Sequence, residues 1–242
     1  MKYTLNLTIV FFLSLFSATG QSINGKITYL ATSKYAESFY KKKVKKNKKE
    51  IKSNILKLYK NSKDVYSILE FNENRSLYYV VDKMEINNDN VNYTHILAGS
   101  EKKFYTNNNL MIYQNNTLDC FLLGECFLIE NKIPKWELKN EAKKIQGFEC
   151  YRAVIKNPRN NKISVEVWYT PEIPYQYGVM NYFGLPGVIL EINRNTFSMT
   201  AIKIELNPLE KIKIEEPKNA KKITEKEFKE LTKKAMPEFY KN

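Results

Sequence analysis

Short runs in which apolar and polar residues alternate recur along the chain, and they predict a protein built mainly from β-strands. In the first run, Ser22–Thr32, every second residue from Ile23 to Ala31 falls on one face. Further strands are expected at Val65–Phe71, Ser76–Val81, Asn92–Ala98, Lys103–Tyr105, Leu110–Tyr113, Cys120–Ile129, Trp136–Leu138, Gly147–Asn157, Lys162–Thr170, Val188–Ile192 and Thr196–Glu205. Asn-rich turns separate several of these runs, which favours antiparallel pairing of successive strands.

Helical spacing of apolar residues is found in two places. The segment Lys48–Tyr59 carries Ile51, Ile55 and Leu58 on one side of a predicted amphipathic helix. Near the C-terminus, Thr224 and Glu227 form a capping box ahead of an apolar stripe made by Phe228, Leu231 and Ala235. The predicted fold class is therefore mainly β with flanking helices (α+β). We expect a curved antiparallel sheet shaped as a half-open barrel, like those of outer-membrane lipoprotein carriers, with a closed barrel or a sandwich as the alternative.

The first twenty residues have the pattern of a secretory signal peptide. Lys2 is the only charge, an apolar run extends from Leu5 to Phe16, and small residues precede a cut before Gln21. The run is short for a membrane span, although a retained anchor is the alternative, and no later stretch approaches about 20 apolar residues. The sequence thus predicts a signal peptide at 1–20, a single β-rich domain at 21–242 without a transmembrane segment, and a periplasmic or extracellular location.

The basic composition bears on partners. The formal net charge is +13, and export excludes nucleic acid as a routine partner. An anionic surface, such as lipid head groups or acidic polysaccharide, suits this charge. The Lys-rich run Lys41–Lys49 is the densest basic segment, and it either docks on such a surface or is simply a solvated charged stretch.

Three cysteines occur in the chain, Cys120, Cys126 and Cys150. In an exported protein a disulfide is expected, and Cys120 with Cys126 would close a small loop. Pairing of Cys150 with either of the other two is the rival arrangement. The chain contains no CxxC pair, and His95 is its only histidine, so neither a metal site nor a cofactor is predicted.

The most distinctive segment contains Gly184, Leu185, Pro186, Gly187, Val188 and Ile189. Pro186 favours a turn and Gly187 tolerates positive φ, so a type II turn is expected over Leu185–Val188. The apolar residues that follow predict a buried strand. This segment contains no obvious chemistry.

Three linked segments resemble one known family. They are Lys144–Ala153, preceded by Trp136, then Val167–Pro174 and Phe183–Ile192. Their order and spacing resemble the GLPGLI family of exported proteins from Gram-negative bacteria, and Gly25–Tyr29 is similar to the opening strand of that family. Val188 stands where the name-giving motif has Leu. The resemblance implies an exported protein, and because the family has no established activity it supplies no catalytic residues.

Candidate chemistry in the sequence is sparse. His95 would need a nucleophile and an orienting acid to act as a general base, and otherwise it is a solvated residue. Glu166, Glu172 and Glu191 lie near the family segments, and a facing pair of them could hydrolyse a sugar polymer. Glu191 alternates with apolar residues, however, so it could simply face outward. No catalytic residue is assigned.

Aromatic residues gather around the Pro-rich turn. Trp168, Tyr169, Tyr175 and Tyr177 form a candidate binding surface, with capping of the core as the alternative. We therefore expect an exported cell-envelope protein that is non-enzymatic and binds a lipid-like ligand or a protein partner, or has a structural role. A hydrolase acting on envelope or extracellular polymers is the alternative. A half-open sheet would hold its lipid-like ligand in an apolar cavity on the concave face.

Overall fold

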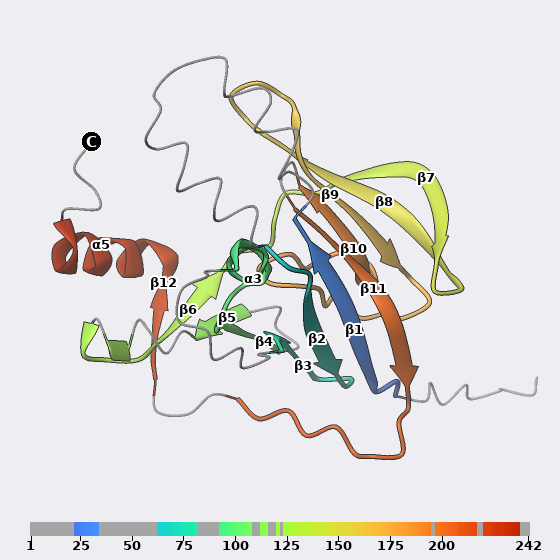
Figure 1. The fold of residues 1–242 in the computed structure, drawn as a ribbon, viewed down its shortest axis with the longest axis horizontal. Helices are drawn as coiled ribbons and strands as arrows, with labels where there is room; N and C mark the ends of the chain where they lie inside the picture. The colour runs from blue at the N-terminus through green and yellow to red at the C-terminus, as the bar shows by residue number, and fades with distance from the viewer. Residues whose placement is uncertain are drawn as a thin grey trace, which may run out of the picture.

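Twelve strands form one sheet in the computed structural model, in the order β12-β6-β5-β4-β3-β2-β1-β11-β10-β9-β8-β7 (Figure 1). The structure describes residues 22–33, 62–81, 92–107, 112–115, 120–121, 123–194, 197–216 and 220–237. The strands are β1 (Gly25–Thr32), β2 (Val65–Phe71), β3 (Arg75–Val80), β4 (Lys103–Asn107), β5 (Ile112–Asn115), β6 (Phe127–Asn131), β7 (Glu137–Ile145), β8 (Phe148–Lys156), β9 (Ile163–Thr170), β10 (Val188–Arg194), β11 (Phe197–Leu206) and β12 (Lys221–Thr224). The helices described are α3 (Tyr93–Ala98) and α5 (Glu225–Ala235).

The sheet is open. Its neighbouring strands pair antiparallel, except that β12 runs parallel to β6. In Figure 1 the strands extend from β12, beside α5, to β7 at the opposite end, and these two end strands do not pair with each other. The predicted β-rich class and open antiparallel sheet are therefore confirmed, and the closed barrel is not formed.

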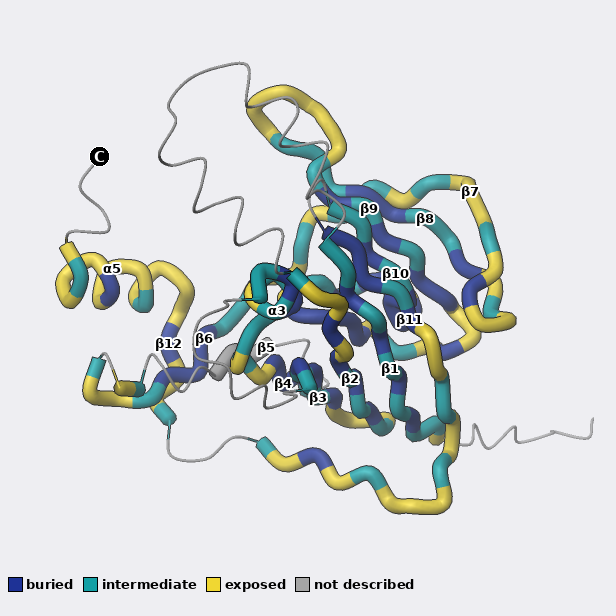
Figure 2. Tube along the Cα trace, in the orientation of Figure 1, coloured by how far each residue is buried: buried dark blue, intermediate teal, exposed yellow. Residues whose placement is uncertain are grey.

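The central strands have one buried and one partly exposed face. Along β1 the burial alternates residue by residue, as expected for a strand with one face in the core. We call the buried side the inner face; it carries Ile27, Tyr29 and Leu69, all with no exposed surface. Buried residues recur along β1, β9 and β10 and in the first half of β11 (Figure 2). The opposite side is called the outer face.

The segment 171–187, between β9 and β10, packs on the inner face. Ile173, Val179, Phe183 and Leu185 are buried in the same hydrophobic cluster as the inner-face residues of β1, β2 and β10. A long connection without regular structure usually lies on the surface, because its backbone groups need partners. Here those partners are supplied locally, for example by the Ile189 N–H, which donates to the Tyr177 carbonyl at 3.2 Å.

Helix α3 replaces the strand predicted at Asn92–Ala98, and that prediction is wrong. The Asn92 side chain accepts a hydrogen bond from the Thr94 N–H at 3.1 Å and caps the helix. The Tyr78 hydroxyl donates to the Ala98 carbonyl at 2.8 Å and secures the other end. Thr94 and Ala98, the buried residues of this helix, are four residues apart. Residues four apart share a face both in a helix and in a strand, so alternation alone could not separate the two.

Other boundaries differ from the sequence prediction at the ends of the sheet. Strand β7 extends to Ile145, well past the predicted Trp136–Leu138, because its polar residues pair across strands instead of facing a core. The run expected as a strand at Cys120–Ile129 starts with helical residues, Cys120, Phe121 and Leu123, and β6 begins only at Phe127. Strand β12 was not predicted; it has four residues and only Ile223 is buried. The predicted helix at Lys48–Tyr59, the run Lys41–Lys49 and the signal peptide 1–20 lie outside the described residues.

The C-terminal helix α5 and its capping box form as the sequence predicts, but of the predicted stripe only Phe228 is partly buried, because Leu231 and Ala235 are exposed and Thr232 is the buried residue. The Thr224 hydroxyl accepts from the Glu227 N–H, and the Glu227 carboxylate accepts from the Thr224 N–H at 2.8 Å. The latter hydrogen bond holds the pKa of Glu227 below its ordinary value. Phe228 packs against Phe127 of β6, with ring centroids 6.1 Å apart. The capping box is therefore confirmed, and the helix contacts β6 and β12 at one end of the sheet.

Candidate functional site

The segment before β10 makes a tighter turn than the sequence predicts. The Gly187 N–H donates to the Leu185 carbonyl at 2.7 Å, which is a three-residue γ-turn centred on Pro186. The Val188 N–H, which would close a type II turn, donates instead to the Ile173 carbonyl at 3.2 Å. The type II prediction is therefore wrong, because a tertiary partner captures the donor that such a turn needs.

Glycine is required at two positions of this corner. At Gly187 a Cβ atom would overlap the backbone carbonyl of Thr170, since β9 and the turn approach each other directly. At Gly184 the φ angle is +85°, and a Cβ atom would lie about as close as 2.5 Å to Cγ2 of Ile133. The two glycines thus allow the corner to pack against β9 on one side and against the segment before β7 on the other.

The four aromatic residues of the predicted binding surface do not lie together. Trp168 and Tyr169 are consecutive on β9 and face opposite sides of the sheet. Tyr175 and Tyr177 contact each other, with ring centroids 5.6 Å apart, and both contact Phe71 on the inner face. Tyr169 and Tyr177 are buried. The structure therefore places Tyr175 and Tyr177 beside the core and leaves Trp168 alone on the outer face.

Trp168 belongs to a set of paired charges that we call the outer-face ion network: Lys143, Arg152, Glu166, Trp168 and Glu191. Lys143 Nζ lies 2.8 Å from Glu191 Oε1 and 4.4 Å from the centroid of the Trp168 ring. Arg152 Nη2 lies 2.7 Å from Glu166 Oε2, and the Trp168 indole N–H donates to Glu166 Oε1 at 3.2 Å. The network joins β7, β8, β9 and β10, and it supports the edge strand β7.

The candidate acid–base residues do not form one site. Glu166 and Glu191 are each engaged in the outer-face ion network, while Glu172 accepts a hydrogen bond from the Glu149 N–H at 2.7 Å. His95 lies on α3, with Nδ1 3.4 Å from the Ser100 hydroxyl. Within the part of the chain that the structure describes, no group of three or more His, Cys, Asp or Glu side chains is placed to hold a metal ion. In the same part, no helix is long and apolar enough to cross a membrane.

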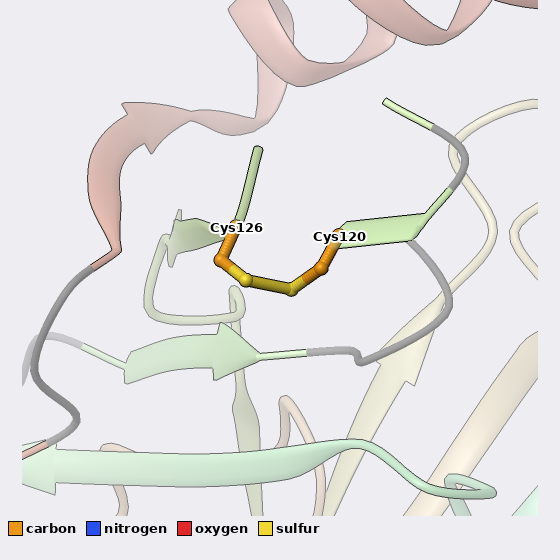
Figure 3. Close-up of a disulfide and its surroundings, with 2 residues drawn as sticks. All are labelled: Cys120 and Cys126. Carbon is orange, nitrogen blue, oxygen red and sulfur yellow. A yellow bond between two sulfur atoms is a disulfide. The ribbon is translucent and has the colours of Figure 1, made fainter. Parts of the chain in front are cut away.

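Cys120 and Cys126 are joined by a disulfide next to β6 (Figure 3), which closes the small loop expected from their spacing. Cys150 is a buried free thiol on β8. Burial raises the pKa of Cys150 to about 11, because the thiolate would have to lose its hydration.

This arrangement predicts a specific thiol reactivity. In the native protein at pH 8, Cys150 should react with iodoacetamide far more slowly than a free cysteine, because the thiolate is the nucleophile and it is scarce here. Unfolding without reductant should expose one thiol per chain, and unfolding with reductant should expose three. Mass spectrometry of the labelled peptides measures both numbers. Labelling of Cys120 or Cys126 before reduction would contradict the pairing.

A second aromatic group lies beside the corner, and sequence reasoning did not single it out as a site. The Trp136 indole N–H donates to the Phe183 carbonyl at 2.8 Å, and the Trp136 and Tyr182 rings lie 6.3 Å apart. The Arg194 guanidinium lies 5.9 Å from the Tyr182 ring. We call this group the corner surface and define it as Ile133, Trp136, Tyr182, Gly184 and Arg194. Trp136, Tyr182 and Arg194 are half-buried, and Ile133 is 47% exposed.

Positive charge lies in the corner surface, on Arg194, and next to it in the chain, on Lys132 and Lys135. None of Arg194, Lys132 or Lys135 forms an ion pair with a described residue, whereas Lys143, Arg152 and Lys156 on the neighbouring strands all do. Lys132 and Lys135 are exposed and flank Ile133 in the chain. The corner surface therefore combines half-buried aromatic rings with positive charge that no acidic residue described in the structure compensates.

Sequence reasoning could not assemble this group. Trp136, Tyr182 and Arg194 are widely separated in the chain, and they meet only because the segment 171–187 folds back over the sheet. The one available signal was the membership of Trp136 in the segments that resemble a known family.

Comparison with known proteins gives a local family likeness. Residues 155–191 match a family described as protein of unknown function (Porph_ging). The match begins at the end of β8, includes β9 and the corner, and ends in β10. No curated protein matches the chain.

Among solved structures, two of PNGF-II, in space groups P21 and C2, resemble the chain. Each has a TM-score of 0.51 and 17% sequence identity, over 88% of this chain and 33% of PNGF-II. At this identity the likeness concerns the fold alone. The chain spans about a third of the length of PNGF-II.

Proposed function

We propose that this is an exported, non-enzymatic binding protein of the cell envelope, that it is a GLPGLI-type protein, and that it contacts a protein partner through the corner surface. The observation that carries the proposal is the clustering of a tryptophan, a tyrosine and an arginine, all half-buried, beside an exposed isoleucine. Trp, Tyr and Arg dominate the energetic centres of protein–protein interfaces, where each supplies a large contact area and a polar group.

The packing of the inner face favours a partner on the surface over a lipid-like ligand inside the sheet. Phe183 and Leu185 fill the inner face beneath the corner and are essentially unexposed. A lipid chain there would have to displace these side chains, which form part of the main hydrophobic core. The corner surface requires no such displacement.

The state of the carboxylates supports a binding function over hydrolysis. A glycosidase needs two carboxyl groups that face one another across a substrate. Glu166 and Glu191 are instead held by Arg152 and Lys143, in contacts of 2.7 and 2.8 Å. These carboxylates connect strands. The outer-face ion network is therefore structural, whereas the corner surface is the proposed binding site.

Site-specific photo-crosslinking tests the proposal in the cells that make the protein. With p-benzoylphenylalanine in place of Ile133, we expect a discrete adduct to one envelope protein, formed by mature chains that begin at Gln21. Adding Tyr182→Ser should reduce this adduct about tenfold, as expected for loss of an interface anchor. The probe at Leu209, which is fully exposed on the connection to β12, is the matched control and should give no such adduct.

An adduct at Ile133 that persists unchanged with Tyr182→Ser would contradict the proposed site. Equal crosslinking from Ile133 and Leu209 would also contradict it, because exposure alone would then explain the reaction. Circular dichroism of the Tyr182→Ser protein must match that of the unaltered protein for the comparison to count.

A further inference from the structure

We infer that the corner surface recognises an acidic peptide segment of its partner, with carboxylates paired to Arg194, Lys132 and Lys135 and an apolar side chain against Ile133, Trp136 and Tyr182. This inference rests on the proposed function and names the chemistry of the partner.

Arg194 is the central group. Its guanidinium lies 4.7 Å from the centroid of the Phe197 ring and 5.9 Å from that of Tyr182, and Nη2 donates to the Leu97 carbonyl of α3 at 2.9 Å. These contacts fix the plane of the guanidinium before any partner arrives. A guanidinium that is already held in place can donate a charge-assisted hydrogen bond to a carboxylate without first having to be ordered.

No carboxylate among the described residues forms an ion pair with Arg194. Its Nε atom is buried and has no hydrogen-bond partner among the described residues, and none of these residues offers it a carboxylate. A half-buried cation without an anion is unfavourable, because the protein replaces hydrating water without supplying opposite charge. An incoming carboxylate would supply that charge.

Lys132 and Lys135 add positive charge close to the exposed Ile133 in the chain. Both are exposed, and neither forms an ion pair with a described residue. Like-charged residues around an apolar centre accelerate association with a partner of opposite charge and exclude partners of the same charge. Because the centre consists of Trp136, Tyr182 and Ile133, the matching ligand carries apolar side chains as well as carboxylates, which favours a peptide over a polysaccharide or a lipid head group.

The experiment uses the whole mature protein and a display library of random twelve-residue peptides. We expect the selected peptides to be enriched in Asp and Glu beside an aromatic or aliphatic residue. The best of them is then synthesised together with a twin in which Gln and Asn replace Glu and Asp. Affinity is measured by the fluorescence of Trp136 in a Trp168→Phe background, which leaves a single tryptophan, and by calorimetry on the unaltered protein.

The amide twin should bind at least about tenfold more weakly, and Arg194→Met should weaken the acidic peptide by a similar factor or more. The double variant Lys132→Gln with Lys135→Gln should also weaken binding of the acidic peptide. It changes only exposed residues, so it tests the inference even if Arg194→Met fails to fold. The control is Lys144→Gln with Lys162→Gln, which removes the same charge from two other exposed lysines and should leave the affinity unchanged.

Selected peptides without acidic residues, or equal affinity of the acidic peptide and its amide twin, would overturn the inference. So would binding to phosphatidylglycerol vesicles that exceeds binding to every selected peptide. If Tyr182→Ser abolishes peptide binding while the charge variants do not, the inference falls and the proposed function stands. If Tyr182→Ser has no effect either, both fall.

Discussion

Replacing Gly187 with alanine should destabilise the protein by about 3 kcal/mol or more, the largest effect expected from so small a change. The added Cβ would overlap the Thr170 carbonyl and lie about 2.8 Å from the Pro171 nitrogen. These are backbone atoms at the end of β9, so they cannot rotate out of the way. Either the γ-turn or the pairing of β9 with β10 has to give. Urea unfolding followed by circular dichroism measures the loss.

Gly147→Ala is the matched control. Gly147 has a φ angle of +87° in the turn between β7 and β8, but a Cβ atom there would meet nothing within 4 Å. It should therefore cost only about 1 kcal/mol, from the unfavourable backbone angle. Equal effects of the two substitutions would show that the close approach to Thr170 does not matter, and our account of the corner would be wrong.

Phe183→Ala should cost about 3–5 kcal/mol. Its side chain is fully buried in the main core, so truncation removes apolar contacts and leaves a cavity beneath the corner. The same urea experiment measures the change in the free energy of unfolding. A loss of this size would establish that the segment 171–187 is part of the core although it contains no strand or helix.

Phe121→Ala is the control, because it makes the same Phe-to-Ala change at an exposed position. Phe121 is 85% exposed in the loop closed by the disulfide, so its removal should change stability by less than about 0.5 kcal/mol. If Phe183→Ala lowers the free energy of unfolding as little as Phe121→Ala does, the corner packs loosely. The inner face could then hold a ligand.

Most strands of the fold could be predicted, because half-buried strands impose alternation on the sequence. The strand Val65–Phe71 was predicted with its observed bounds, and the antiparallel pairing expected of successive strands is found between β10 and β11. The prediction failed where alternation was absent or ambiguous. Strand β7 is polar because it lies at an edge, and the residues of α3 fit either period until Asn92 caps the helix.

The candidate site was less accessible to sequence reasoning. The four aromatics chosen around the Pro-rich turn were close in sequence, yet Trp168 and Tyr169 face opposite sides of β9. Local spacing fixes which residues alternate, but it does not fix which face a later segment covers. Trp136 and Arg194 came together only through the path of the segment between β9 and β10.

The sequence by itself determined the β-rich class, most of the strands and the C-terminal capping box, because each depends on the residue types within a short stretch. Tertiary structure alone decided the γ-turn, the parallel pairing of β12 and the grouping of Trp136, Tyr182 and Arg194. Each of these depends on a contact between residues far apart in the chain. The Val188 N–H donates to the Ile173 carbonyl, β12 pairs with β6, and Trp136 meets Tyr182 because the segment 171–187 folds back over the sheet.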